Sequence, residues 1–184
     1  AGPLSAAFER FGIEEPLHIA AFLAQAMHES SRFTALEENL NYRAGGMMAA
    51  WPSRFKTLES TRPCMRNSAA PIDARSPADP VKLANSVYGG RMGNTEPGDG
   101  WRYRGRGIFQ LTGMGGYKVA GDDLGLDLVA RPELVAFPDV ACLTAARYWM
   151  RFKNPITCDE AMRMGKPFRN VTQIINGGQN GAEE

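Results

Sequence analysis

Apolar residues recur at helical spacing in several separate segments of the chain. They are densest in PLHIAAFLAQAM, residues 16–27, where too few positions are polar for a solvent-exposed helix. Pro16 suits a first helical turn, and the acidic residues before it favour a helix N-terminus. The pattern predicts a largely buried helix that ends close to Glu29. A carboxylate at that end faces the unfavourable pole of the helix dipole, so stability does not explain its position.

Weaker periodicities predict further helices along the rest of the chain. Gly12 has the place of a helix-ending residue after the first of them. In residues 138–152 we expect one side of the helix to carry Val140, Leu143, Ala146, Arg147 and Met150, with Trp149 adjacent. The other predicted helices are residues 4–12, 47–55, 79–90, 115–125, 159–165 and 168–178.

Two regions lack this periodicity. EENLNYRAGG, residues 37–46, indicates an extended turn or short hairpin, and a second small β element is expected near 103–111. The Gly-rich loop at 91–107 is long, and long structured loops are commonly functional. Strands do not alternate with helices, which argues against a parallel sheet. We expect a mainly α protein of the α+β type: one helical domain over residues 1–184 with a small β-hairpin lobe.

The composition is that of a globular domain. Of the 184 residues, 43% are hydrophobic and 22% charged, enough for a real core. No apolar run reaches the roughly 18 residues that cross a membrane, and the first residues do not form a signal peptide. The net charge of +1 argues against a nucleic-acid partner. The densest basic cluster, WRYRGRG at 101–107, fits a structural loop better than a polyanion site.

The three cysteines, Cys64, Cys142 and Cys158, have no CxxC spacing. They form neither a disulfide framework nor a zinc site, although one disulfide remains open. We expect mostly buried free thiols, which fits a chain made in a reducing cytoplasm.

The dipeptide His28-Glu29 raises the question of a metal site. A helical zinc protease site needs a second histidine four residues after the first, and that position is Arg32. The other histidine, His18, lies ten residues upstream on a different helical face. The sequence also lacks a GxSxG elbow and a Walker loop. We therefore expect neither a metal nor an organic cofactor.

A pair of carboxylates remains as candidate chemistry. Glu38 follows Glu29 by nine residues, with Glu37 beside it. Nine residues span at most about 30 Å, so both groups can reach one substrate. Glycoside hydrolysis needs such a pair, because one group protonates the leaving oxygen and the other activates water. Spacing alone fits two solvated glutamates equally well.

Three segments change this balance. AQAMHESSRFTALEENLNY, WRYRGRGIFQLTGMGGY and VTQIINGGQNG together resemble glycoside hydrolase family 19, in the family's order. The sequence is most similar to phage and prophage endolysins, which share a lysozyme-like fold with plant-type chitinases. The resemblance implies a substrate cleft in a lysozyme-like domain.

The resemblance also implies roles for individual residues. Glu29 matches the general acid, Glu38 the second carboxylate that activates water, and Thr112 a residue that positions this water. The implied substrate-binding or supporting residues are Gln110, Asn176, Tyr42, Arg104 and Tyr117, and Trp101 offers a flat face that suits either a sugar ring or the core.

Two features depart from the family pattern. Gly115-Gly116 stands where many relatives have larger residues before the tyrosine, and the chain stops soon after INGG. The first departure puts a sugar contact at that place in doubt.

The expected function is inverting hydrolysis of β-1,4 bonds in bacterial peptidoglycan by a monomer with muramidase activity. A chitinase of the same mechanism and a non-catalytic wall-binding module are the alternatives. The expected route is synthesis in the bacterial host cytoplasm and action on the wall in the periplasm after release.

Overall fold

The computed structural model describes residues 2–150 and 158–165. The chain forms two compact units. The first unit contains Ala1–Glu37, Gly105–Leu111 and Tyr117–Glu184, and the second contains Glu38–Arg104 and Thr112–Gly116. The expected single domain over the whole chain stays a prediction.

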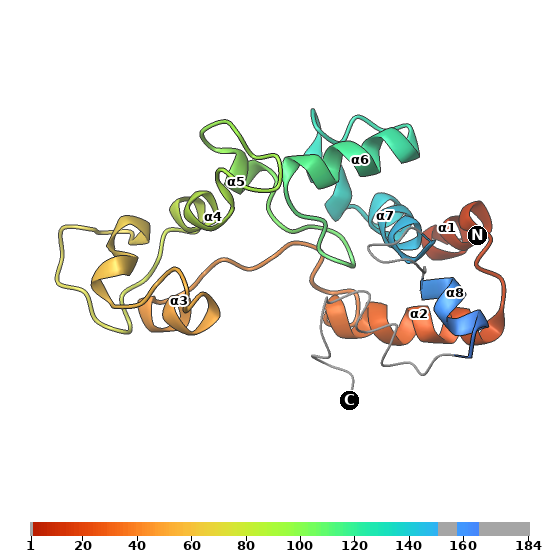
Figure 1. Cartoon of the computed structure of the whole chain (residues 1–184), viewed down its shortest axis with the longest axis horizontal. Coiled ribbons are helices and arrows are strands. Elements are labelled where there is room, and N and C mark those ends of the chain that lie inside the picture. The colour runs from red at the N-terminus through yellow and green to blue at the C-terminus, as the bar shows by residue number, and fades with distance from the viewer. Residues whose placement is uncertain (1, 151–157, 166–184) are drawn as a thin grey trace. The chain divides into compact units, whose positions relative to one another are not determined.

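Helices form most of the first unit (Figure 1). α1 (Pro3–Phe11) packs on α7 (Pro138–Met150), and α8 (Cys158–Arg163) contacts both α2 (Pro16–Glu29) and α7. The unit also contains the 3₁₀-helix η2 (Pro132–Ala136) and most of α6 (Met114–Leu124). Gly12 ends α1 with a φ of +65°, a left-handed conformation that glycine adopts without strain. This confirms the expected helix stop.

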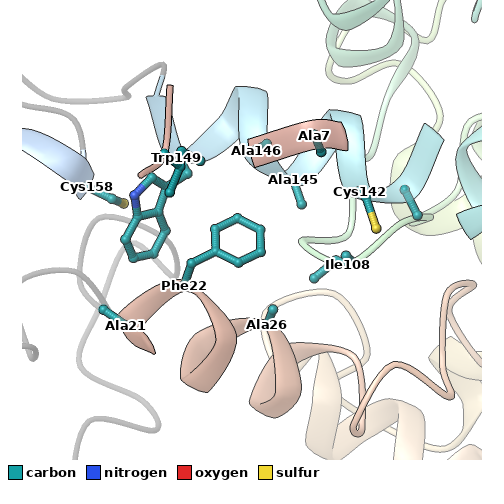
Figure 2. Close-up of a cluster of buried hydrophobic side chains, with 12 residues drawn as sticks. Ala7, Ala21, Phe22, Ala26, Ile108, Cys142, Ala145, Ala146, Trp149 and Cys158 are labelled. Carbon is teal, nitrogen blue, oxygen red and sulfur yellow. The ribbon is translucent and has the colours of Figure 1, made fainter. Parts of the chain in front are cut away.

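The core of the first unit is built around Phe22 (Figure 2). Its fully buried ring makes edge contacts with Phe8, Trp149 and Phe109, with ring centroids 5.0, 5.3 and 5.5 Å away. Aromatic pairs of this geometry add about 0.5–1.5 kcal/mol each to their area burial. These contacts of Phe22 anchor the middle of α2 in the core. Glu29 lies about two turns further on, at the C-terminal end of the same helix.

The inner face of α7 agrees with the predicted one only in part, since Ala146, Arg147 and Trp149 are buried as expected. Val140, Leu143 and Met150 are only partly buried, whereas Ala145 and Trp149 lie in the core. Small alanines allow α1 to approach α7 closely, so packing selects a face by shape as well as by hydrophobicity. The other buried apolar residues of α7 are Ala141, Cys142 and Ala146.

The second unit contains α3 (Ala44–Ala50), the 3₁₀-helix η1 (Glu59–Cys64), α4 (Pro80–Tyr88) and α5 (Asp99–Arg102). α4 begins at Pro80, and the carboxylate of its N-cap Asp79 accepts hydrogen bonds from two backbone N–H groups of the first turn. α4 packs on α5, where a Cβ at Gly100 would lie 2.6 Å from the carbonyl oxygen of Ala84. The unit has its own core, which includes Leu40, Met47, Phe55, Met65, Leu83 and Val87.

The mainly helical fold class is confirmed, with corrections in detail. Among the described residues, β pairing consists of isolated antiparallel bridges, at Glu37 with Arg106 and at Arg43 with Pro77 for example. Ala44–Gly46 belong to α3 and not to the expected turn, and the loop at 91–107 contains α5. The expected helix at 168–178 lies outside the described residues.

The three cysteines are free and buried, as expected. Within the described part of the chain, every helix is too short or too polar to span a bilayer.

Candidate active site

Glu29 is the last residue of α2 and is partly buried. The side-chain amide of Gln25 donates a hydrogen bond of 2.8 Å to Oε1 of Glu29. Gln25 is only 2% exposed and lies four residues earlier, which places both side chains on one face of the helix. This contact orients the carboxyl group and engages one of its two oxygens as an acceptor.

The chain turns sharply directly after Glu29. Ser31, Arg32 and Phe33 have φ values of 48°, 60° and 65°, a left-handed conformation that is costly for residues other than glycine. Ser30 stabilises this turn, because its buried Oγ donates to the carbonyl of Ala26 at 2.5 Å and accepts from the N–H of Phe33 at 2.8 Å. The turn ends α2 at Glu29 and leaves its carboxylate at the helix terminus.

Tyr148 of α7 is a further neighbour of Glu29. Burial raises the pKa of the Tyr148 hydroxyl, and the nearby Cys158 and Glu29 add to this effect. The ring of Tyr148 also contacts that of Phe109, with 5.8 Å between centroids. A protonated phenol therefore lies in the electrostatic environment of Glu29.

Glu37 and Glu38 are adjacent in sequence but have different partners. Glu37 forms an ion pair with Arg106, with 2.8 Å between Oε1 and Nε. Arg106 is 4% exposed, and its Nη1 also donates to the hydroxyl of Tyr117 at 3.0 Å. The resemblance implied that Tyr117 either binds substrate or supports the site. Tyr117 has no exposed surface, which fits the supporting role.

Glu38 accepts a hydrogen bond from Tyr88, the last residue of α4. The distance from the Tyr88 hydroxyl to Oε2 of Glu38 is 2.8 Å. Burial strongly raises the pKa of Tyr88, and the negative charge of Glu38 raises it further. Tyr88 therefore remains a proton donor to this carboxylate throughout the neutral range. No sequence signal pointed to Tyr88, since it is fifty positions away from Glu38.

Trp101, Arg104 and Tyr42 lie in the second unit. The guanidinium of Arg104 stacks on Trp101, 3.8 Å from the ring centroid, and its Nη1 donates to the Trp101 carbonyl at 2.9 Å. Trp101 is partly buried and packs against the core of the second unit, and the Arg104 guanidinium covers one face of its ring. The ring of Tyr42 contacts Trp51, with 5.0 Å between centroids. These contacts give Trp101 and Tyr42 a clear packing role.

Gln110 is the last residue of the tight turn at 107–110, and Thr112 lies two positions after it. Gln110 has a φ of 50°, and its amide donates to the carbonyl of Gly107 at 3.2 Å. Thr112 is partly buried and precedes Gly113, whose N–H donates to the Tyr103 carbonyl at 2.8 Å.

The predicted site residues are divided between the two units. Glu29, Gln110 and Tyr117 belong to the first unit, and Glu38, Tyr42, Trp101, Arg104 and Thr112 belong to the second. Asn176 lies outside the described residues.

The predicted roles stay predictions, but the structure adds partners that sequence reasoning missed: Gln25, Tyr148 and Tyr88. Helical spacing from Glu29 could have identified Gln25. The described residues contain no group of three or more potential metal ligands.

Comparisons with known proteins find relatives over nearly the whole chain. Residues 84–182 match the family model described as chitinase class I. A glycosyl hydrolase family 19 domain-containing protein of Haemophilus influenzae is 36% identical over 185 residues, which cover 98% of this chain and 81% of that protein. Chitinase 11 of Oryza sativa subsp. japonica is 47% identical over 92 residues, 42% of this chain and 36% of that protein.

A solved structure has the same fold. The crystal structure of chitinase C from Streptomyces griseus HUT6037 matches with a TM-score of 0.59 and 26% identity, covering 95% of this chain and 70% of that one. The chain therefore belongs to glycoside hydrolase family 19, which confirms the resemblance seen in its motifs. Membership places it among enzymes that hydrolyse glycosidic bonds in glycan polymers.

Proposed function

We propose that this protein cleaves β-1,4 glycosidic bonds of bacterial peptidoglycan as an endolysin-type muramidase. The observation that carries the hydrolytic mechanism is that each candidate carboxylate accepts from a neutral donor, Gln25 for Glu29 and Tyr88 for Glu38. These hydrogen bonds orient both carboxylates. Glu29 then protonates the leaving oxygen, and Glu38 draws a proton from the attacking water.

Thr112 positions that water in this proposal. A hydroxyl group can both donate to a water and accept from it, and a threonine is small enough to leave room for one. Because the water attacks opposite the leaving group in a single displacement, the anomeric configuration inverts. The reaction needs no metal or organic cofactor.

Peptidoglycan is favoured over chitin by two observations. The three motif segments resemble those of phage and prophage endolysins. The cysteines are buried free thiols, as is typical of proteins made in a reducing compartment. We therefore propose synthesis in the bacterial host cytoplasm, and action as a monomer on the wall in the periplasm after release, leading to lysis.

Chitin is the second candidate substrate. Chitinase 11 of rice and chitinase C of Streptomyces griseus are both named for activity on this polymer. The two-carboxylate mechanism is the same for either glycan, because both are built on N-acetylated sugars joined by β-1,4 bonds.

Digestion of purified peptidoglycan beside chitin oligomers tests the proposal. We expect faster release of reducing ends from peptidoglycan, and mass analysis of the products will identify the bond that is cut. Faster turnover of chitin would overturn the choice of substrate. Failure to cleave either glycan would favour the third hypothesis, a non-catalytic wall-binding module.

Two further measurements test the mechanism. Glu29→Gln should lower turnover by roughly 10²–10⁴-fold, since it removes the general acid. Glu14→Gln, at an exposed position of the same unit, should leave turnover unchanged. Proton NMR of the first product should detect the α-anomer, and release of the β-anomer would contradict inversion.

A further inference from the structure

A small pocket in the second unit is bordered by two arginine side chains. Its volume is about 230 Å³, below the roughly 300–1,000 Å³ of pockets for drug-sized ligands. It therefore suits a group the size of one amino-acid residue. We call it the Arg43–Arg66 pocket; its lining residues are Asn41, Tyr42, Arg43, Arg66, Pro77 and Ala78.

Backbone pairing brings the two arginines together. Pro77 and Ala78 lie between two extended segments, with antiparallel bridges from Arg43 to Pro77 and from Met65 to Ala78. The N–H of Arg66 donates to the carbonyl of Pro77 at 3.1 Å. The positions of both arginines are thus set by main-chain hydrogen bonds.

Each guanidinium is also oriented by a carbonyl group. Nη1 of Arg43 donates to the carbonyl of Arg75 at 2.8 Å, and Nε of Arg66 donates to the carbonyl of Ala78 at 3.1 Å. A guanidinium has five N–H donors, so most of them remain for a ligand. Among the residues that the structure describes, no carboxylate forms an ion pair with Arg43 or Arg66, and the pocket lining contains none. The pocket is therefore a positively charged site with oriented donors.

This chemistry suits a carboxylate. Arginine binds carboxylate groups through paired N–H donors, and two arginines on one small pocket strengthen that preference. The pocket also adjoins the segment of the proposed base, because Tyr42 follows Glu38 by only four positions within the same unit. A glycan strand held at Glu38 would bring its substituents near this place.

The two candidate glycans differ in charge at such substituents. Chitin consists of uncharged N-acetylglucosamine. Peptidoglycan carries short peptides on every second sugar, and these stem peptides contain free carboxylates. We propose that the Arg43–Arg66 pocket binds a carboxylate of the peptidoglycan stem peptide, and so selects peptide-bearing strands. This inference rests on the proposed function and names the part of the substrate that distinguishes it from chitin.

Kinetics on matched substrates test this proposal. We compare Arg43→Gln/Arg66→Gln with wild type on intact peptidoglycan and on the same peptidoglycan after carbodiimide coupling has converted its free carboxylates to amides. We expect KM for intact peptidoglycan to rise about tenfold or more, the usual size for lost hydrogen bonds to a charged group, with no change on the amidated peptidoglycan. An equal loss on both substrates would overturn the proposal.

A control pair separates the pocket from overall charge. Arg54→Gln/Lys56→Gln changes the net charge by the same amount at exposed positions of the same unit, away from the pocket. This variant should behave like wild type on both substrates. If its KM for intact peptidoglycan rises as much as that of the pocket variant, the effect belongs to general electrostatic attraction and the proposal fails.

A binding experiment on the wild-type protein requires no substitution in the pocket. Muramyl dipeptide with a free terminal carboxylate should bind at least tenfold more tightly than its methyl ester, as measured by calorimetry. Equal binding of the two would overturn the proposal. Inorganic phosphate should compete weakly; tighter binding of phosphate than of the free muramyl dipeptide would assign the pocket to phosphate-bearing wall polymers instead and overturn the stem-peptide assignment.

The two proposals can fail separately. If wild type cleaves only chitin but binds the free carboxylate in preference to the ester, the proposed substrate is wrong and the pocket assignment stands. If it cleaves peptidoglycan but does not distinguish the two dipeptides, the pocket assignment is wrong and the proposed function stands.

Discussion

Glu29 and Glu38 differ in how their carboxylates are oriented. The amide that donates to Glu29 belongs to Gln25, one helical turn earlier on α2. The hydroxyl that donates to Glu38 belongs to Tyr88, at the end of α4 and fifty positions away. The first contact joins two residues of one helix, whereas the second joins segments that are far apart in the sequence of the second unit.

The donors differ in chemistry as well. Tyr88 is a partly buried phenol whose pKa is raised by burial and by the charge of Glu38 itself. Gln25 is an amide that cannot ionise at any accessible pH. We therefore expect the catalytic role of Glu38 to depend more on its hydrogen-bond donor than that of Glu29 does. The following predictions test this difference.

The largest effect is expected at Glu38 itself. Glu38→Gln should lower kcat by roughly 10²–10⁴-fold, because it removes the group that activates water. KM should change little, since this role matters in the transition state more than in binding. Release of reducing ends under saturating and limiting substrate will separate the two constants.

Glu37→Gln is the matched control for that substitution. Its carboxylate is paired with buried Arg106, so the variant should lose thermal stability more than turnover. If Glu37→Gln lowers kcat as much as Glu38→Gln does, the wrong neighbour has been assigned as the base.

Tyr88→Phe should have the next largest effect. It removes one hydroxyl that donates to a charged carboxylate, and such hydrogen bonds contribute about 1.5–3 kcal/mol. We expect kcat to fall about tenfold to a hundredfold, with the protein still folded by circular dichroism. Tyr103→Phe, a buried tyrosine of the same unit, is the control and should retain turnover.

Gln25→Met should have a smaller effect on turnover than Tyr88→Phe. The substitution keeps the volume and the helix but removes the amide that orients Glu29, a contact of about 1 kcal/mol. We expect kcat to fall about fivefold. In the double variant the two losses should multiply, because residues without shared partners act independently. If Gln25→Met alone lowers kcat more than Tyr88→Phe does, Glu29 depends more on its hydrogen-bond donor than Glu38 does, contrary to our expectation.

The smallest effect is the alkaline titration of Tyr88. Its folded pKa is raised, so above about pH 10 the unfolded chain loses this proton while the folded protein retains it. The contribution of the Tyr88 proton to the free energy of unfolding is therefore complete below about pH 10 and decreases as the pH rises further. Tyr88→Phe should show a weaker decline of the free energy of unfolding between about pH 10 and 11.5. An identical decline in both proteins would contradict the raised pKa.

Local signals in the sequence determined most of the helices and part of the site. Gly12 ends α1, Pro16 begins α2 and Asp79-Pro80 begins α4, because caps and prolines act within one turn of the chain. The spacing of four residues from Gln25 to Glu29 is also a local signal, although only the structure showed the hydrogen bond between them. The three family motifs were also legible without any structure, which is why family membership could be predicted.

Only the tertiary structure decided the contacts between distant segments. The inner face of α7 was predicted only in part, because close helix packing buried small residues such as Ala141 and Ala145 in place of Val140. Tyr88 reaches Glu38, and Arg66 joins Arg43 on one pocket, through packing and backbone pairing across 23 to 50 positions. Such contacts depend on free energies summed over a whole folded unit, and no periodicity in the sequence encodes them individually.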